Sequence, residues 1–201
     1  MKIFNLGMSK TGTTSFHHLM QELHLKSFHD VLISEHTVDE LKKEFTLMDC
    51  YSGALSHRYK DIYAAYPDAK YVLTIRDEIG WLKSARKQFT YNDVNFSKFR
   101  TAIFGTTKVS DMSDDDMLKC FNRINNEIID FFKDKKNFMV LNFINSTDKD
   151  NLMKELLEFL NIRVISNVLY TRIWGNSVKL FPAENVEVSN NLKFPQKNKS
   201  K

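Results

Sequence analysis

Near the start of the sequence lies the stretch IFNLGMSKTGTTSFHHLM, residues 3–20, where a short apolar run meets a loop rich in glycine and threonine. Gly7 and Gly12 have the spacing of the Walker A phosphate loop, G-x-x-x-x-G-K-[ST]. Thr13 occupies the lysine position of that motif, and the lysine of this loop, Lys10, comes two residues before the second glycine. The loop therefore predicts an anion site that differs from the usual triphosphate site.

The residues around this loop predict a strand followed by a helix. Residues 2–6 form a compact apolar run, and the apolar residues from Phe16 to Leu23 recur at helical spacing behind Thr13 and Thr14. Unpaired backbone N–H groups and the positive end of the helix dipole meet at such a junction. Thr11, Thr13 and Thr14 add hydroxyl donors there. The alternative is a plain strand-to-helix turn whose threonines bind nothing.

The rest of the chain alternates in the same way. Strand patterns at residues 45–49, 70–75 and 138–143 alternate with helical patterns at 34–45, 56–67, 78–89, 113–134 and 146–160. This order predicts an α/β fold of three αβα layers with a central parallel sheet, similar to P-loop nucleotide-binding folds. Ligands bind at the carboxyl ends of the strands in such sheets. We therefore expect the site in the loops 7–14, 49–52, 76–77 and 143–146.

Length and composition predict one ordinary globular domain. The chain has 201 residues, 42% hydrophobic and 27% charged, with a net charge of +4. We expect a single domain over residues 1–190 and a flexible, polar, basic tail over 191–201. The charge is too small to indicate nucleic acid as a partner. The two cysteines do not have the spacing of metal ligands. We find no apolar run long enough to span a membrane and no signal peptide, and we therefore expect a cytoplasmic protein.

The segment SKTGTTS, residues 9–15, resembles the 5′-phosphosulfate loop of sulfotransferases that use 3′-phosphoadenosine 5′-phosphosulfate (PAPS). In that family the lysine stands two residues before the glycine, as Lys10 does here. The resemblance implies that PAPS is the co-substrate and that its 5′-phosphosulfate is bound by the loop. The residues that this assigns to binding are Ser9, Lys10, Thr11, Gly12, Thr13 and Thr14.

A second segment, YPDAKYVLTIRDEIGWLKSARKQF at residues 66–89, resembles the 3′-phosphate-binding segment of the same family. There an arginine ends a strand and a serine follows eight residues later, as Arg76 and Ser84 do here. A guanidinium can bind a phosphate through a charge-assisted fork, and Ser84 could add a hydroxyl. The alternative reading is a surface pair of Arg76 with Asp77 and an exposed helical serine. The basic C-terminal segment by which many members bind the 3′-phosphate is not found in this sequence.

Sulfuryl transfer needs stabilisation of the leaving oxygen and a base for the acceptor hydroxyl. Lys10 is the candidate for the leaving oxygen, because a flexible ammonium can follow developing charge. The family resemblance implies a His, Glu or Asp as base. We expect Asp49 in this role, at the end of the predicted strand 45–49, and His57 is the second candidate. No metal is expected, and the acceptor is a hydroxyl or amine of a small molecule or glycan.

Two other functions remain open from the sequence. One is a P-loop NTPase or small-molecule kinase, in which Asp49 would end a Walker B strand and bind Mg²⁺. The other is a nucleotide-binding protein without catalysis. The acidic run Asp114–Asp116 resembles a metal site, but its place behind Ser113 favours a solvated helix start.

Overall fold

The computed structural model describes residues 1–31, 33, 35–90, 97–164 and 186–188, and for residues 163, 164 and 186–188 it describes the backbone alone. Its centre is a five-stranded sheet in the order β2-β3-β1-β4-β5, and every neighbouring pair is parallel. The strands are β1 (Ile3–Asn5), β2 (Ser27–Val31), β3 (Cys50–Gly53), β4 (Lys70–Thr74) and β5 (Phe138–Leu141). The predicted parallel α/β sheet is confirmed.

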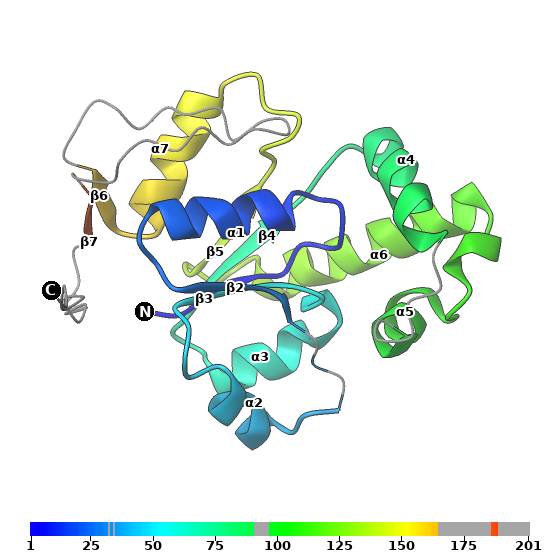
Figure 1. The fold of residues 1–201 in the computed structure, drawn as a ribbon, viewed down its shortest axis with the longest axis horizontal. Coiled ribbons are helices and arrows are strands. Elements are labelled where there is room, and N and C mark those ends of the chain that lie inside the picture. The colour runs from blue at the N-terminus through cyan, green and yellow to red at the C-terminus, as the bar shows by residue number, and fades with distance from the viewer. Residues whose placement is uncertain (32, 34, 91–96, 165–185, 189–201) are drawn as a thin grey trace, which may run out of the picture.

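Helices cover both faces of this sheet, as Figure 1 shows. One face carries α1 (Thr13–Glu22) and α7 (Lys149–Phe159). The other carries α2 (Val38–Glu44), the 3₁₀ helix η1 (Ser56–Arg58), α3 (Tyr59–Ala65) and the long α6 (Asp114–Phe132). The helices α4 (Glu78–Phe89) and α5 (Ser97–Phe104) and the short η3 (Val109–Asp111) extend the second core beyond the carboxyl edge of the sheet.

Alternation along the strands explains these two cores. Ile3 of β1 and Val72 of β4 point into the core under α1 and α7, whereas Phe4 and Tyr71 point into the opposite core. Successive side chains of a strand face opposite sides, so strands covered on both faces are apolar throughout. The three central strands, β1, β3 and β4, are therefore buried. The polar loops lie where the strands begin, which we call the amino edge of the sheet, and where they end, which we call the carboxyl edge.

The prediction of a strand at residues 45–49 is wrong. Phe45 ends α2, and the strand that follows is β3, which begins at Cys50. The phenylalanine and leucine of that stretch read as strand residues, but Phe45 is buried as the C-cap of a helix. The edge strand β2 was not predicted, because its sequence, SFHDV, is short and does not alternate regularly between polar and apolar residues.

Other local predictions are confirmed. Ser113 caps α6, with Asp114–Asp116 in its first turn, where the helix dipole stabilises negative charge.

A separate antiparallel pair joins β6 (Ile162–Val164) to β7 (Val186–Val188). The predicted flexible tail at 191–201 lies outside the described residues. Among the described residues, no helix combines the length and apolar character needed to cross a bilayer.

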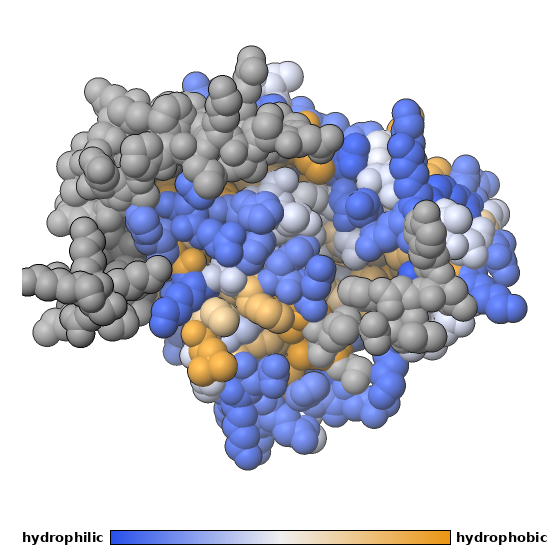
Figure 2. Space-filling model, in the orientation of Figure 1, coloured by the Kyte–Doolittle hydropathy of each residue, from blue (hydrophilic) through white to orange (hydrophobic). Residues whose placement is uncertain are grey.

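The face of the molecule in Figure 2 is mostly hydrophilic, but hydrophobic residues gather between α1 and the α2–α3 pair. The edge strand β2 lies in this region, and its Phe28 is 48% exposed. Edge strands commonly leave part of one face open, and we assign no function to this surface.

Candidate functional site

The two sequence segments with phosphate-binding patterns meet at one edge of the sheet. The loop 6–12 follows β1, and Arg76 follows β4, the strand paired directly with β1. Because the two strands are parallel, both loops leave the sheet at the carboxyl edge. The fold therefore brings together Lys10 and Arg76, which are 66 residues apart in the sequence.

Two residues of the loop have a left-handed backbone conformation. Lys10 has a φ of 72° and Gly12 a φ of 97°, both in the left-handed region. Gly12 is the N-cap of α1, and no side chain caps the first N–H groups of this helix. Left-handed backbone at a non-glycine residue is uncommon and is enriched at functional sites. This geometry suits an anion at the start of α1.

A buried polar network holds the loop from below. Asn5 Oδ1 accepts hydrogen bonds from Gly7 N at 2.9 Å and from Thr74 Oγ1 at 3.0 Å. The Thr74 hydroxyl also contacts Thr11 Oγ1 at 2.9 Å, and Thr11 Oγ1 donates to the Met8 carbonyl at 2.7 Å. The hydroxyl of Thr11 is thus turned into the protein. It shapes the loop, while Thr14 keeps an exposed side chain on the first turn of α1.

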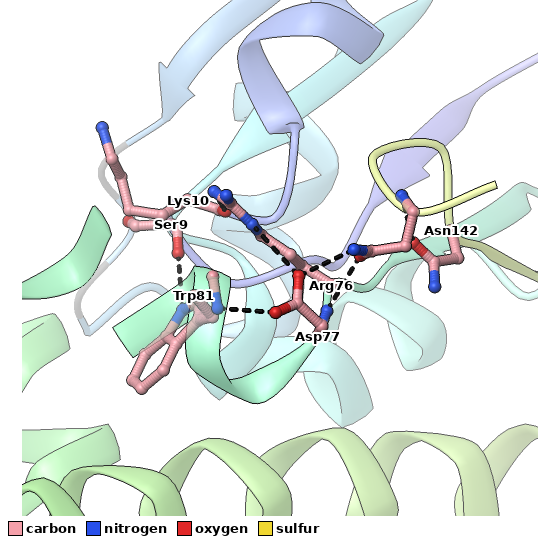
Figure 3. A network of polar contacts seen from close by, with 8 residues as sticks. Ser9, Lys10, Arg76, Asp77, Trp81 and Asn142 are labelled. Carbon is pink, nitrogen blue, oxygen red and sulfur yellow. Dashed lines mark hydrogen bonds and ion pairs between the residues drawn. The ribbon is translucent and has the colours of Figure 1, made fainter. Parts of the chain in front are cut away.

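The first turn of α4 braces the same loop from outside, as Figure 3 shows. Trp81 Nε1 donates to the Ser9 carbonyl at 3.0 Å, and Arg76 Nη1 lies 3.5 Å from the Lys10 carbonyl oxygen. Trp81 is fully buried and stacks on Phe121 with ring centroids 4.2 Å apart. Trp81 is therefore a core residue that fixes the loop, and it cannot offer its ring to a ligand.

Asp77 connects the loop after β4 with the loop after β5 at this edge. It is the N-cap of α4, accepting from Gly80 N at 2.6 Å, and it exchanges two hydrogen bonds with Asn145, from the loop after β5. These hydrogen bonds hold the pKa of Asp77 below its ordinary value. The pair with Arg76 that the sequence left open is present but loose, with Nε and Oδ2 3.7 Å apart.

Arg76 and Ser84 lie on the same side of α4. A Cβ added at Gly80 would come within 2.9 Å of Arg76 Nε, so the guanidinium lies against the first turn of the helix. Ser84 follows Gly80 by four residues, which places it one turn further on the same helical face. The N–H of Gly80 at this helix start is already bonded to Asp77, so the Arg76 guanidinium is the group there that can bind a phosphate, with Ser84 one turn further on.

Asp49 lies at the other edge of the sheet, which corrects the prediction that it ends a strand near the ligand. It precedes β3, and its carbonyl accepts from the N–H of Ile3 at the beginning of β1. Its carboxylate accepts from the N–H of Lys26 at 2.9 Å. The phosphate loop leaves the opposite end of β1, so Asp49 and Lys10 are separated by the length of the strand.

His57 lies in η1, which follows β3 at the carboxyl edge of the sheet. Its Nε2 is 3.1 Å from the Ile33 carbonyl oxygen, and its ring meets Phe99 edge to face. Burial, followed by the nearby charge of Arg58, lowers its pKa to about 4. The imidazole is therefore neutral at pH 7, but a pKa this far below 7 makes it a weak base, and its Nδ1 is buried.

Several residues at this edge were missed in the sequence. Asn5 and Thr74 are polar residues inside apolar strands, IFN and KYVLT, and that contrast is a usable signal for them. His29 and Ser52 were missed because β2 was not recognised. His29 contacts Thr14 at 3.0 Å and Ser52 at 2.8 Å. Only the pairing of β2 with β3 brings these side chains to the loop.

A cavity of about 230 Å³ opens at the far end of α4, lined by Phe89, Arg100 and Lys108 among others. None of the residues predicted to bind PAPS or to act in catalysis lines it. Among the described residues, no three His, Cys, Asp or Glu side chains are grouped as a metal ion would require.

Comparison with known proteins identifies the family. A family model described as "Sulfotransferase domain" matches residues 2–201. No curated protein sequence matches the chain at a significant level.

Proposed function

Because the chain belongs to the sulfotransferase domain family, we propose that it transfers a sulfuryl group from PAPS to a hydroxyl or amine of a small molecule or glycan. The observation that carries the proposal is the convergence of the loop after β1 with Arg76 and the start of α4. The uncapped start of α1 and the two cations Lys10 and Arg76 at one edge suit a ligand with two separate anionic groups.

In this proposal the loop binds one anionic group of the nucleotide and Arg76 binds the other. The 5′-phosphosulfate lies on the start of α1, against Lys10, Thr13 and Thr14. The 3′-phosphate lies on Arg76 and Ser84. A strong Walker-type triphosphate site would need a lysine where Thr13 stands, at the first position of α1.

The transfer itself forms one bond and breaks one. The acceptor oxygen attacks the sulfur, the bond from sulfur to the bridging phosphate oxygen breaks, and 3′,5′-adenosine bisphosphate (PAP) leaves with the electron pair. Lys10 stabilises the charge on that oxygen. We propose His57 as the base that takes the acceptor proton, since it is neutral and lies at the carboxyl edge. Asp49 is not proposed for this role, because it lies at the opposite edge.

Nucleotide affinity tests the binding half of the proposal. PAP and adenosine 5′-phosphosulfate, which lacks the 3′-phosphate, are titrated against the wild type and Arg76→Ala. Loss of a charge-assisted contact should weaken PAP by about 10–100-fold and leave adenosine 5′-phosphosulfate within about threefold. Arg86→Ala is the matched control, because Arg86 also lies on α4 but binds Asp114. Equal weakening of both nucleotides by Arg76→Ala would refute the assignment of the 3′-phosphate.

Thermal unfolding in the presence of each nucleotide tests the kinase alternative. A ligand that binds the folded state alone raises the unfolding midpoint, so PAP should raise it and ATP with Mg²⁺ should raise it less. Stabilisation by ATP with Mg²⁺ and none by PAP would replace the proposed donor with a nucleoside triphosphate.

A further inference from the structure

Behind the exposed Thr14, four side chains from three elements are joined in a short polar chain. His29 Nε2, on β2, is 3.0 Å from Thr14 Oγ1 and 3.3 Å from the carboxylate of Asp30. The other ring nitrogen, Nδ1, is 2.8 Å from Ser52 Oγ on β3. Ser52 is fully buried, while Thr14 is exposed at the anion-binding end of α1.

These contacts decide which nitrogen of His29 carries the proton. The Asp30 carboxylate lies 3.3 Å from Nε2 as a close charge contact, and a negative charge at that place favours the tautomer that carries its proton on Nε2. Nε2–H then donates to Thr14 Oγ1, and Ser52 donates its hydroxyl hydrogen to Nδ1. Because Thr14 Oγ1 accepts from His29, the hydrogen of the Thr14 hydroxyl remains available to a ligand.

A bulge in β2 makes this arrangement possible. Neighbouring residues of a regular strand point to opposite faces, yet His29 and Asp30 come together. The register of β2 against β3 shifts between Phe28 and Val31, and Asp30 has a φ of 61°. Gly53 accommodates the bulge, because a Cβ there would lie 2.9 Å from Asp30 N. Bulges that redirect side chains in this way are over-represented near active sites.

We propose that His29 is a positioning residue for the anion site: it holds the Thr14 hydroxyl as a hydrogen-bond donor toward the 5′-phosphosulfate, with Asp30 and Ser52 fixing its tautomer. The proposal rests on the proposed function, because it assumes that the loop binds this group. His29 need not touch the nucleotide. It acts through Thr14 alone.

The same geometry argues against an activated Thr14 nucleophile. A hydroxyl becomes nucleophilic when a histidine nitrogen accepts its proton, whereas here Nε2 is the donor. The groups that face His29 are His17 and His18 from α1 and Asp30 from its own strand. Burial lowers the pKa of His29, so its ring is neutral at pH 7. Protonation at lower pH keeps the Nε2–H donor and adds a positive charge near the anion.

Two substitutions at position 29 test the proposal with adenosine 5′-phosphosulfate as the probe. His29→Gln keeps an amide N–H near the place of Nε2, so its affinity at pH 7.5 should stay within about threefold of wild type. His29→Asn is too short to reach Thr14, and its affinity should fall by about 5–30-fold, as for a lost hydrogen bond that serves a charged ligand. Equal affinities of the two variants would overturn the proposal. The urea midpoints of both variants show whether each is folded.

A double-mutant cycle shows whether His29 acts through Thr14. In a Thr14→Val background, which has no hydroxyl to hold, His29→Asn should cause no further loss of affinity. Additive losses would mean that His29 acts by another route and would refute the positioning role. His18→Asn is the control, since His18 is exposed on the same helix and bonds Gln21.

The pH dependence separates this proposal from a purely structural role. The probe has no group that titrates between pH 5.5 and 8, so wild-type affinity should rise below about pH 6.5 as His29 gains a proton. His29→Gln should lose that rise, and a rise retained in that variant would contradict the proposal. If wild type binds PAP and Arg76→Ala weakens it, the proposed function stands whatever the His29 variants show.

Discussion

The two edges of the central sheet differ in the polar groups that they carry. At the carboxyl edge, the uncapped start of α1, the loop lysine and Arg76 present N–H donors and positive charge, beside the Asp77 carboxylate that caps α4. At the amino edge, the carboxylate of Asp49 is already bonded to the backbone of Lys26. A parallel sheet thus makes one edge suited to anions and leaves the other to structural contacts. The direction of a strand therefore decides whether a nearby polar residue is a candidate for the site.

The largest expected effect concerns the packing beneath the carboxyl edge. A Cβ added at Gly7 would overlap the Thr74 hydroxyl and lie 2.7 Å from the Thr74 carbonyl oxygen. Gly7→Ala should therefore lower the free energy of unfolding by about 3 kcal/mol or more, because backbone must move. Urea denaturation measures the loss. Gly105→Ala, where nothing lies within 4 Å, should cost about 1 kcal/mol from its positive φ alone.

If both alanine variants lost the same small amount of stability, the loop after β1 would not be closely packed on β4. The inference that the network of Asn5, Thr74 and Thr11 supports the carboxyl edge would then be wrong.

His57 gives a pH test of the same edge. Its pKa is about 4 in the folded chain, against an ordinary value near 6.5. The unfolded chain therefore binds the proton first, and stability falls as the pH drops from about 6.5 to 4. The two values correspond to a loss of about 3 kcal/mol over that window. His57→Gln, which cannot be protonated, should lack this part of the loss when urea denaturation is compared at pH 7.5 and 4.5.

An identical pH dependence in wild type and His57→Gln would show that the imidazole is hydrated and charged in the folded state. The burial effect on the pKa of His57 would then be refuted, and an imidazole with an ordinary pKa would be a stronger base at neutral pH.

The sequence predicts the fold and half of the site, for reasons that particular residues make clear. The loop of Lys10 and the strand end at Arg76 are local patterns, so they could be recognised without knowing the fold. Asn5 and Thr74 showed only as polar residues in apolar strands. The contacts of His29 depend on β2, whose bulge at Asp30 breaks the alternation by which strands are recognised.

The error at Asp49 has a similar cause. The stretch FTLMD has strand-forming residues, but Phe45 packs as the end of α2, and β3 begins one residue after Asp49. Moving the strand by these few residues changes Asp49 from the end of one strand to the beginning of the next. In a parallel sheet that change transfers the residue from the ligand edge to the opposite edge.

The smallest expected effect is therefore that of Asp49→Asn. The amide oxygen can still accept from Lys26 N, and the variant loses only a negative charge near Lys2. Turnover should stay within about twofold of wild type, whereas removal of a general base lowers turnover by about 10²–10⁴-fold. Single-turnover transfer is measured for Asp49→Asn beside His57→Asn, which should show the larger loss with PAP affinity retained. A hundredfold loss in Asp49→Asn with intact PAP affinity would mean that chemistry reaches the amino edge, and the contrast between the two edges would fail. Because the strand β1 separates Asp49 from the loop, such a loss would also require an acceptor site outside the carboxyl edge.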